Sequence, residues 1–184
     1  GSWLSSPGWR FESVPEGARL LVSLLPSLNK AAVAAAVGAE EASEAVGNAV
    51  TAVLAGFADI NAEARSQGVP TIGASHGTLN GCQTEHGVPM AGLDHEFTES
   101  SIFAAGCDAF MLGHIHKCQS WARPGQLIAY AGSLGRLHYG ETDTKGWLLW
   151  DVEPGDPSAQ QVPTPARRMV HLDFTGKPDM DAIR

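Results

Sequence analysis

Long hydrophobic runs and positive charge are both scarce in this chain of 184 residues. The longest apolar stretches, among them Leu20–Pro26 and Ala31–Val37, fall far below the about 20 residues that a membrane-spanning helix needs, which excludes a transmembrane protein. Lys and Arg number 12 against 20 Asp and Glu, and the formal net charge is −8. This balance argues against tight nonspecific binding of nucleic acid, which depends on basic residues. Metal ions held in a site would nevertheless invert the local field.

Cysteine is also rare. Cys82, Cys107 and Cys118 form an odd set without CxxC spacing, so we expect no disulfide framework and predict a reducing, cytoplasmic location. Cys118 lies two residues after a pair of histidines, where an incidental neighbour is favoured over a metal ligand. The sequence contains no convincing Ser-His-Asp arrangement, P-loop or dinucleotide fingerprint. It therefore does not indicate a serine hydrolase, a P-loop nucleotide-binding protein or a dinucleotide-binding enzyme.

Strands and helices are predicted to alternate in the first half of the chain. Apolar residues recur at spacings of three and four over positions 46–60, which predicts one amphipathic helix packed against the core. Gly68 and Pro70 end this helix, and a short Ala-rich helix is expected over Lys30–Val37. Strand candidates are Arg19–Leu25 and Val69–Ser75, and a Gly-rich loop is expected from Gly77 to about His95.

Strands dominate the second half. A short helix is predicted over Phe97–Ala105, and a buried strand over Ala109–Leu112. A turn is expected over Glu141–Gly146. Further strand candidates are Leu127–Ala131, Trp147–Val152 and Arg168–Phe174. This order predicts an α/β sandwich whose second sheet is largely antiparallel.

Three histidines stand at the ends of two predicted strands. His76 follows one strand, and His114 and His116 follow the other in the sequence Gly-His-Ile-His. Ligands of open α/β sheets gather outside the carboxyl ends of the strands, which is the physical reason to group these residues. A single histidine of this kind is more often an ordinary half-buried side chain, but the combined pattern favours a metal centre. Imidazole suits zinc, iron, manganese and nickel, so the residues do not choose the ion.

Other polar residues are weaker candidates. Gly132-Ser133 and Gly135-Arg136 form a loop at another strand end, where Ser133 and Arg136 are candidate contacts for a phosphate or substrate. A surface arginine, or one paired with Glu141, is an equally good interpretation of Arg136. The remaining histidines are weaker still as ligands: His86, His95, His138 and His171.

Three stretches, occurring in this order, together form a fairly specific signature of one protein family: residues 74–78 (ASHGT), 110–117 (FMLGHIHK) and 128–133 (IAYAGS). Residues 145–150 (KGWLLW) add the character of a closing strand. With these residues the chain resembles the calcineurin-like metallophosphoesterases, and within them the DNA-repair exonucleases of the SbcD type. The resemblance covers roughly residues 70 to 152.

The resemblance implies a partial metallophosphoesterase-type β-sandwich flanked by helices, that is, an incomplete four-layer αββα fold. Residues 1–18 would be an N-terminal loop and residues 19–155 the C-terminal part of the metallophosphoesterase domain. Residues 156–184 would form a terminal strand leading toward a missing capping region. The resemblance also implies that His76 and His114 bind one metal of a binuclear centre and that His116 binds the other.

Two divalent ions, with manganese the expected metal, activate a water and neutralise the phosphodiester in such enzymes. The remaining family ligands come from Asp-x-His, Gly-Asp-x-x-Asp and Gly-Asn-His motifs, none of which occurs in this sequence. Without a bridging carboxylate, nothing holds two cations about 3.5–4 Å apart against their mutual repulsion. We therefore expect at most one weakly bound ion in this chain alone, and no catalysis.

Two classes of function fit these residues. One is an incomplete metal-dependent phosphodiesterase or DNA exonuclease, with small phosphodiesters as an alternative substrate; the other is a non-catalytic binding or assembly lobe. The resemblance implies DNA and an SMC-like ATPase subunit as partners. The short apolar stretches predict no membrane association. Loss of the N-terminal half of the fold would expose apolar sheet edge, so we expect either a complementing half or self-association.

Overall fold

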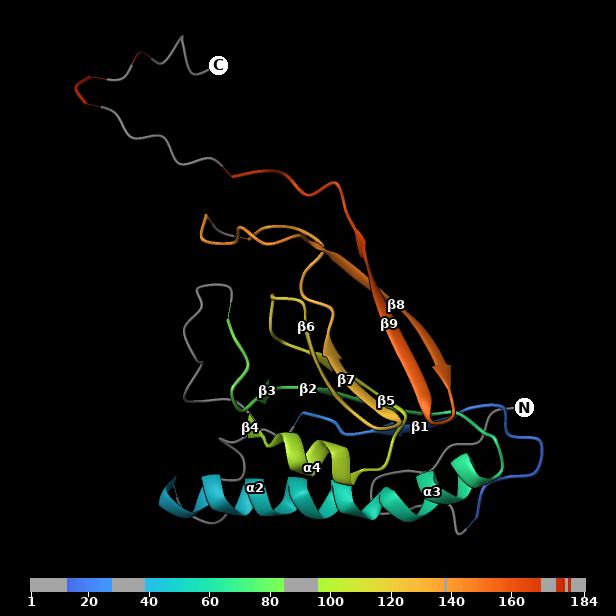
Figure 1. The fold of residues 1–184 in the computed structure, drawn as a ribbon. Coiled ribbons are helices and arrows are strands. Elements are labelled where there is room, and N and C mark those ends of the chain that lie inside the picture. The colour runs from blue at the N-terminus through green and yellow to red at the C-terminus, as the bar shows by residue number, and fades with distance from the viewer. Residues whose placement is uncertain are drawn as a thin grey trace.

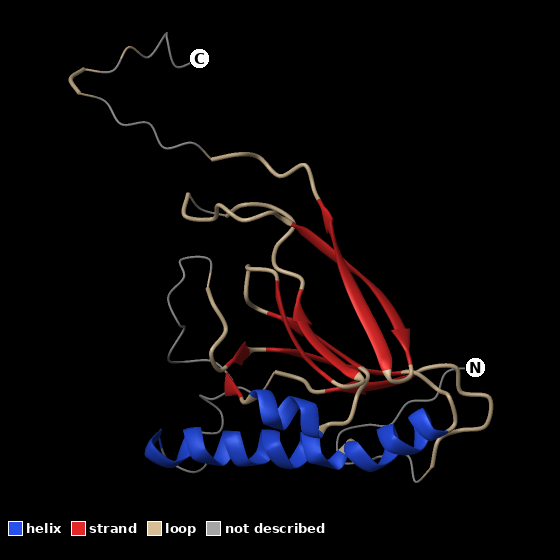
Figure 2. Cartoon of the chain, viewed as in Figure 1, coloured by secondary structure: helices blue, strands red, loops and turns tan. Residues whose placement is uncertain are grey.

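The computed structural model describes residues 13–27, 39–84, 96–137, 139–169, 175–177 and 179, with the side chains of its first helix from residue 46 onward. In this part of the chain, helices form one layer, a five-stranded sheet forms the next, and a hairpin lies on the side of the sheet away from the helices (Figures 1 and 2). The helices are α2 (Ala39–Gly56), α3 (Ala58–Ser66) and α4 (Glu99–Ala104). The strands are β1 (Leu21–Leu24), β2 (Thr71–His76), β3 (Thr78–Leu79), β4 (Glu96–Phe97), β5 (Ala109–Gly113), β6 (Gln119–Arg123), β7 (Gln126–Tyr130), β8 (Gly146–Glu153) and β9 (Asp156–Pro163).

The central sheet has the strand order β1-β2-β5-β7-β6, and its neighbours run parallel except for β6, which is antiparallel to β7. The predicted strands in this sheet are confirmed as β1, β2, β5 and β7. Side chains alternate between the two faces: Leu21 and Ser23 are buried on one face of β1, whereas Val22 and Leu24 are exposed on the other. The helices therefore cover one face of the sheet, and the opposite face is open at β1.

The single helix predicted over positions 46–60 is divided between α2 and α3, which meet at Phe57. The Phe57 N–H donates to the Leu54 carbonyl oxygen at 3.1 Å, a three-residue turn that tightens the end of α2. Val50 and Leu54 are buried as the apolar stripe predicts, whereas Val53, at the edge of the stripe, is 44% exposed.

The helix predicted over residues 97–105 is shorter than expected because Thr98 caps it. The Thr98 side-chain oxygen accepts from the Ser101 N–H at 3.0 Å, and α4 begins at the next residue, Glu99. Phe97 lies before the cap in β4, and its ring is buried in the core.

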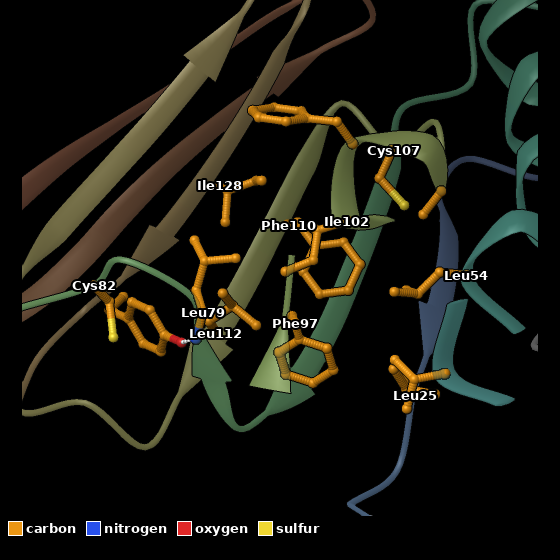
Figure 3. Close-up of a cluster of buried hydrophobic side chains, with 14 of the residues drawn as sticks. Leu25, Leu54, Leu79, Cys82, Phe97, Ile102, Cys107, Phe110, Leu112 and Ile128 are labelled. Atoms are coloured by element: carbon orange, nitrogen blue, oxygen red, sulfur yellow. Dashed lines mark hydrogen bonds between the residues drawn. The ribbon is translucent and has the colours of Figure 1, made fainter. Parts of the chain in front are cut away.

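The main core lies between the central sheet and the helices (Figure 3). Phe110 on β5 pairs in register with Gly73 on β2. A Cβ atom at Gly73 would lie 2.2 Å from the Phe110 ring, so glycine is required for this close packing. The residues labelled in this cluster are Leu25, Leu54, Leu79, Cys82, Phe97, Ile102, Cys107, Phe110, Leu112 and Ile128.

Four strands were not predicted. The strands β3 and β4 have only two residues each, too few to show a pattern, and β6 and β9 are mostly polar. Both β6 and β9 are joined to their hairpin partners by a Pro-Gly pair whose glycine has a positive φ, 73° at Gly125 and 80° at Gly155. Such pairs mark tight turns, and the glycine tolerates this conformation because it has no Cβ. The sequence pattern that could have predicted β6 and β9 is therefore the Pro-Gly pair in each turn, and not the residues of the strands themselves.

The strand predicted over Arg168–Phe174 is wrong where the structure describes it. Residues 164–169 have no regular structure, and residues 170–174 lie outside the described part of the chain, as do the helix predicted over Lys30–Val37 and residues 85–95 of the expected loop. Instead, β9 pairs with β8, the confirmed strand at residues 147–152. The domain boundary expected after residue 155 falls in the turn of this hairpin.

The observed architecture is mixed α/β, with a multi-strand sheet flanked by helices, as the sequence predicts. The antiparallel hairpin β8–β9 is a separate two-stranded sheet. Among the described residues, we find no helix long and apolar enough to cross a membrane.

Candidate metal centre

His76 and His114 lie side by side at one edge of the central sheet. His76 is the last residue of β2 and pairs in register with Gly113, the last residue of β5, so the two histidines leave neighbouring parallel strands at the same end. Their ring centroids are 5.1 Å apart and the rings are nearly perpendicular, with an interplanar angle of 68°. The structure thus brings together the two imidazoles that the resemblance assigns to one ion.

Gly113 makes the close approach of the two rings possible. A Cβ atom at this position would lie 2.9 Å from Nδ1 of His76, closer than real Cβ contacts allow. The Gly77 N–H donates to the Gly113 carbonyl oxygen at 3.2 Å, which continues the pairing of the two strands beyond His76. Gly113, the residue before His114, therefore leaves the space that the His76 ring occupies.

The backbone of His114 is strained. Its φ is 111°, and it is the only residue other than glycine with a positive φ in the described part of the chain. A side chain with a Cβ rarely adopts this conformation, and such residues cluster at sites where the surrounding structure imposes a functional geometry. The Nε2 atom of His114 is buried.

His116 is directed toward a different partner. Its Nδ1 lies 3.4 Å from Oε1 of Glu141, and its side chain is 34% exposed. Glu141 is in turn paired with Lys145, whose Nζ lies 2.8 Å from Oε2 of Glu141. Both members of this pair are buried, with 1% of Glu141 and 2% of Lys145 exposed. The sequence predicted only a turn over residues 141–146, so this pair was missed.

The Glu141 side chain is held as a carboxylate. Burial opposes its ionisation, but the hydrogen bond from Lys145, the Leu137 N–H, the Lys145 charge and the contact with His116 outweigh burial and lower its pKa below the ordinary value. An ionised carboxylate accepts hydrogen bonds and donates none. The ring nitrogen of His116 that faces it is therefore the natural donor.

The loop after β7 approaches His116 closely. A Cβ atom at Gly132, whose φ is 81°, would lie 2.9 Å from the His116 carbonyl oxygen, so glycine is needed here for both space and conformation. Ser133, a candidate substrate contact, donates its hydroxyl to the Gly135 carbonyl oxygen at 2.9 Å. Its side chain is thus engaged within the loop.

Arg136, the other candidate for a phosphate contact, is half-buried and binds backbone carbonyl oxygens. Its Nε donates to the Glu141 carbonyl oxygen at 2.8 Å and its Nη2 to that of Asp143 at 3.0 Å. Its Nη1 contacts the carbonyl oxygens of Ala166 and Arg167 at 3.4 and 3.2 Å. These contacts match the alternative in which Arg136 pairs locally, here with the backbone of Glu141.

Tyr130 connects β7 to the segment that follows His76. Its buried hydroxyl donates to the Gly77 carbonyl oxygen at 2.6 Å and accepts from the Leu79 N–H at 2.8 Å, and burial raises the pKa of this phenol. The hydroxyl thereby fixes the backbone on the C-terminal side of His76. In the sequence, Tyr130 is part of the stretch that carries the family resemblance, and its contact with the backbone after His76 was not predicted.

Cys118 lies in surroundings that disfavour its thiolate. Burial, and then the charge of Asp143, raise the pKa of its thiol. The three cysteines are all free, as expected from their spacing. His86, His95, His138 and His171 lie outside the described residues.

These residues fit part of a metal centre. In the ranges that the structure describes, no group of three or more His, Cys, Asp or Glu side chains is placed to hold a metal ion. Catalytic zinc sites use three protein ligands and structural sites use four. The facing imidazoles of His76 and His114 match two positions of such a shell, and His116 stands apart at Glu141.

Comparison with curated proteins supports a metal-dependent phosphoesterase family. The chain is 37% identical over 87 residues to a Bacillus subtilis (strain 168) protein described as an uncharacterized metallophosphoesterase, YhaO. The match covers 47% of this chain and 20% of the relative, so the chain spans about a fifth of the relative's length. No family model matches the chain. The relative's description names neither a nucleic-acid substrate nor a particular ion.

Proposed function

We propose that this chain is part of a metal-dependent phosphodiesterase, and specifically of a DNA exonuclease of the SbcD type. His76 and His114 bind one divalent ion, and His116 binds a second. The observation that carries the proposal is the pair of imidazoles 5.1 Å apart at the ends of neighbouring parallel strands, one of them on strained backbone. The similarity to a metallophosphoesterase supports the same chemistry.

Divalent ions, with manganese as the proposed metal, supply Lewis-acid stabilisation and an activated water in phosphodiester hydrolysis. The chain's own contribution is to hold imidazole ligands at the sheet edge. Gly113 leaves room for the His76 ring, and Tyr130 fixes the backbone that follows it. The described residues supply no carboxylate bridge, so we propose that this chain alone is inactive and acquires the remaining ligands from another segment or chain.

The proposed partners follow from the exonuclease assignment. Linear duplex DNA is the substrate, and an SMC-like ATPase is the companion subunit in a cytoplasmic complex. The net charge of −8 leaves little basic surface for binding DNA, so bound cations provide much of the attraction for its phosphates. A small phosphodiester is the alternative substrate.

A non-catalytic binding or assembly lobe is the second candidate. Two observations favour it: the guanidinium of Arg136 is engaged by backbone carbonyl oxygens, and no third ligand stands beside His76 and His114 in the described ranges. A lobe of this kind would keep the fold without turning over a phosphodiester.

Calorimetric titration with Mn²⁺ and Zn²⁺ separates these functions. We expect one ion to bind the chain and expect His114→Ala to weaken binding at least about tenfold, since the substitution removes a ligand. Cys118→Ser is the matched control and should bind as the wild type does. Cleavage of bis-p-nitrophenyl phosphate and of linear duplex DNA is assayed in the same samples.

Each outcome has a distinct meaning. One ion without turnover supports a partial centre. Two tight sites with manganese-dependent cleavage that His114→Ala abolishes would show that the chain is a complete enzyme and would refute the proposed incompleteness. The absence of metal binding by the wild type would reject the proposal in favour of the non-catalytic lobe.

A further inference from the structure

The buried pair formed by Glu141 and Lys145 needs a reason beyond stability. Taking two charges out of water costs several kcal/mol per ion, and replacing such a pair with apolar residues is often neutral or stabilising. The pair is nevertheless almost wholly buried, with its charged atoms 2.8 Å apart. Its contacts with neighbouring groups therefore indicate what the pair does.

Those contacts converge on His116. Oε1 of Glu141 lies 3.4 Å from the His116 ring at Nδ1, and Nζ of Lys145 donates to the His116 carbonyl oxygen at 3.1 Å. One member of the pair thus faces the ring and the other holds the backbone of the same residue. Lys145 also contacts Asp143 at 3.4 Å, so its ammonium is held from three directions.

The loop that carries Glu141 is itself tied down. Arg136 binds the carbonyl oxygens of Glu141 and Asp143, and the Leu137 N–H donates to Oε2 of Glu141 at 3.3 Å. The Gly146 N–H donates to the Ser133 carbonyl oxygen at 3.2 Å, which closes the loop after Lys145. The carboxylate is therefore in a fixed position when it meets the imidazole.

A carboxylate facing Nδ1 selects one tautomer of a neutral imidazole. The proton is placed on Nδ1, where it is donated to the carboxylate, and the lone pair is left on Nε2. Histidines that bind metals usually show this arrangement, in which the outer partner sets the tautomer and the direction of the ring. The His116 side chain is 34% exposed, so its ring remains accessible from outside.

We infer that Glu141 and Lys145 are positioning residues that hold His116 as the Nδ1–H tautomer with Nε2 presented to a divalent transition-metal ion. The metal-binding part of this inference rests on the proposed function. The tautomer does not, because it is a property of the chain without any metal.

Nitrogen-15 NMR of the histidine rings at alkaline pH tests the tautomer directly, with His116→Gln identifying the His116 signals. We expect the wild type to show the Nδ1–H form. The double variant Glu141→Leu/Lys145→Met removes both charges and keeps apolar bulk in the buried space, so we expect it to fold and to shift His116 toward the Nε2–H form. Glu99→Gln is the control, since Glu99 forms an exposed pair with Arg123 and should leave His116 unchanged.

A Zn²⁺ titration, followed by the NMR signals of the His116 ring nitrogens, tests metal binding at this residue. His116 offers a single imidazole in this chain, so its Zn²⁺ site is too weak to count as a second ion in calorimetry, but its ring nitrogens report binding at high Zn²⁺ concentration. We expect the half-saturating concentration at His116 to rise about 10- to 100-fold in the double variant, the usual loss when an outer partner is removed. An unchanged titration in a folded double variant would overturn the positioning role and leave the proposed function standing.

Two further outcomes separate the inference from the proposed function. An Nε2–H tautomer in the wild type would overturn the inference without recourse to any variant. A wild-type Nδ1–H tautomer that changes in the double variant, together with no response of His116 to Zn²⁺, would support the positioning of the ring and reject the metal role of His116.

Discussion

His114 is the residue whose own conformation points most directly to a function. A φ of 111° at a residue with a Cβ costs about 1–3 kcal/mol and persists only where the surrounding structure imposes it. The residue follows directly on β5, and its ring contacts that of His76. The strained backbone of His114 therefore coincides with the close contact between its imidazole ring and that of His76.

Two substitutions of His114 measure this strain. Both His114→Gly and His114→Ala remove the imidazole, but only glycine adopts a positive φ without a steric penalty. We expect His114→Gly to be more stable than His114→Ala by about 1 kcal/mol, measured by urea denaturation.

The same pair of substitutions at His116 is the control. His116 has no positive φ, so glycine there should be less stable than alanine by about 0.4–1 kcal/mol because it loosens the unfolded chain. If glycine were no better than alanine at position 114, the strained backbone would not be a property of the protein in solution.

Asp108 shows how one side chain joins separate elements. Its Oδ2 accepts from the N–H of Thr71 at 2.8 Å and from its hydroxyl at 2.7 Å, and its Oδ1 accepts from the Gly155 N–H at 2.8 Å and lies 2.8 Å from Nε of Arg65. These partners belong to β2, the β8–β9 turn and α3. The carboxylate thus ties the hairpin and a helix to the same end of the sheet.

Loss of this carboxylate should destabilise the fold strongly. We expect Asp108→Ala to lower the free energy of unfolding by about 3–5 kcal/mol, since it leaves Arg65 and three donors without their acceptor. Arg65 is 28% exposed and regains some solvation, which places the result toward the lower end. Urea denaturation measures the change.

Glu99→Ala is the matched control for Asp108→Ala. Glu99 and Arg123 form a pair at 3.4 Å in which both side chains are 44% exposed, and such pairs contribute about 0–1 kcal/mol. A loss of similar size at both positions would contradict the central role assigned to Asp108.

At the scale of the whole molecule, the sheet is covered unequally. The helices pack on one face of the central sheet, and β1 lies at an edge of that sheet (Figure 1). Apolar side chains at β1 are exposed on the other face. Leu20 and Val22 are each 47% exposed and Leu24 is 66% exposed. An apolar edge strand is a ready partner for another chain.

We therefore predict that the isolated chain self-associates through β1. Leu24→Lys should shift the species seen in sedimentation velocity toward the monomer, because it places a charge on the apolar edge. Ser120→Lys on β6, the opposite edge of the same sheet, is the control and should leave association unchanged. A wild-type chain that sediments as a stable monomer would contradict this prediction.

Much of the fold could be predicted because its signals are local. The alternation in β1 and the apolar runs of β2 and β5 lie within a few residues, and each predicts its own strand without reference to the rest of the chain. The polar strands β6 and β9 lack such a signal, since their hydrogen bonds come from their hairpin partners. The break at Phe57 was missed because the apolar stripe continues across it.

By itself, the sequence determined that His76 and His114 stand at the ends of two strands, because the strand pattern and the histidine that follows it are adjacent in the chain. Only the tertiary structure decided that these two rings face one another while His116 turns to Glu141. It also decided that Arg136 binds backbone carbonyl oxygens and that Lys145 reaches the His116 backbone. The physical reason is distance along the chain: Glu141 and Lys145 are 25 and 29 residues from His116, and only the order of the strands brings them together.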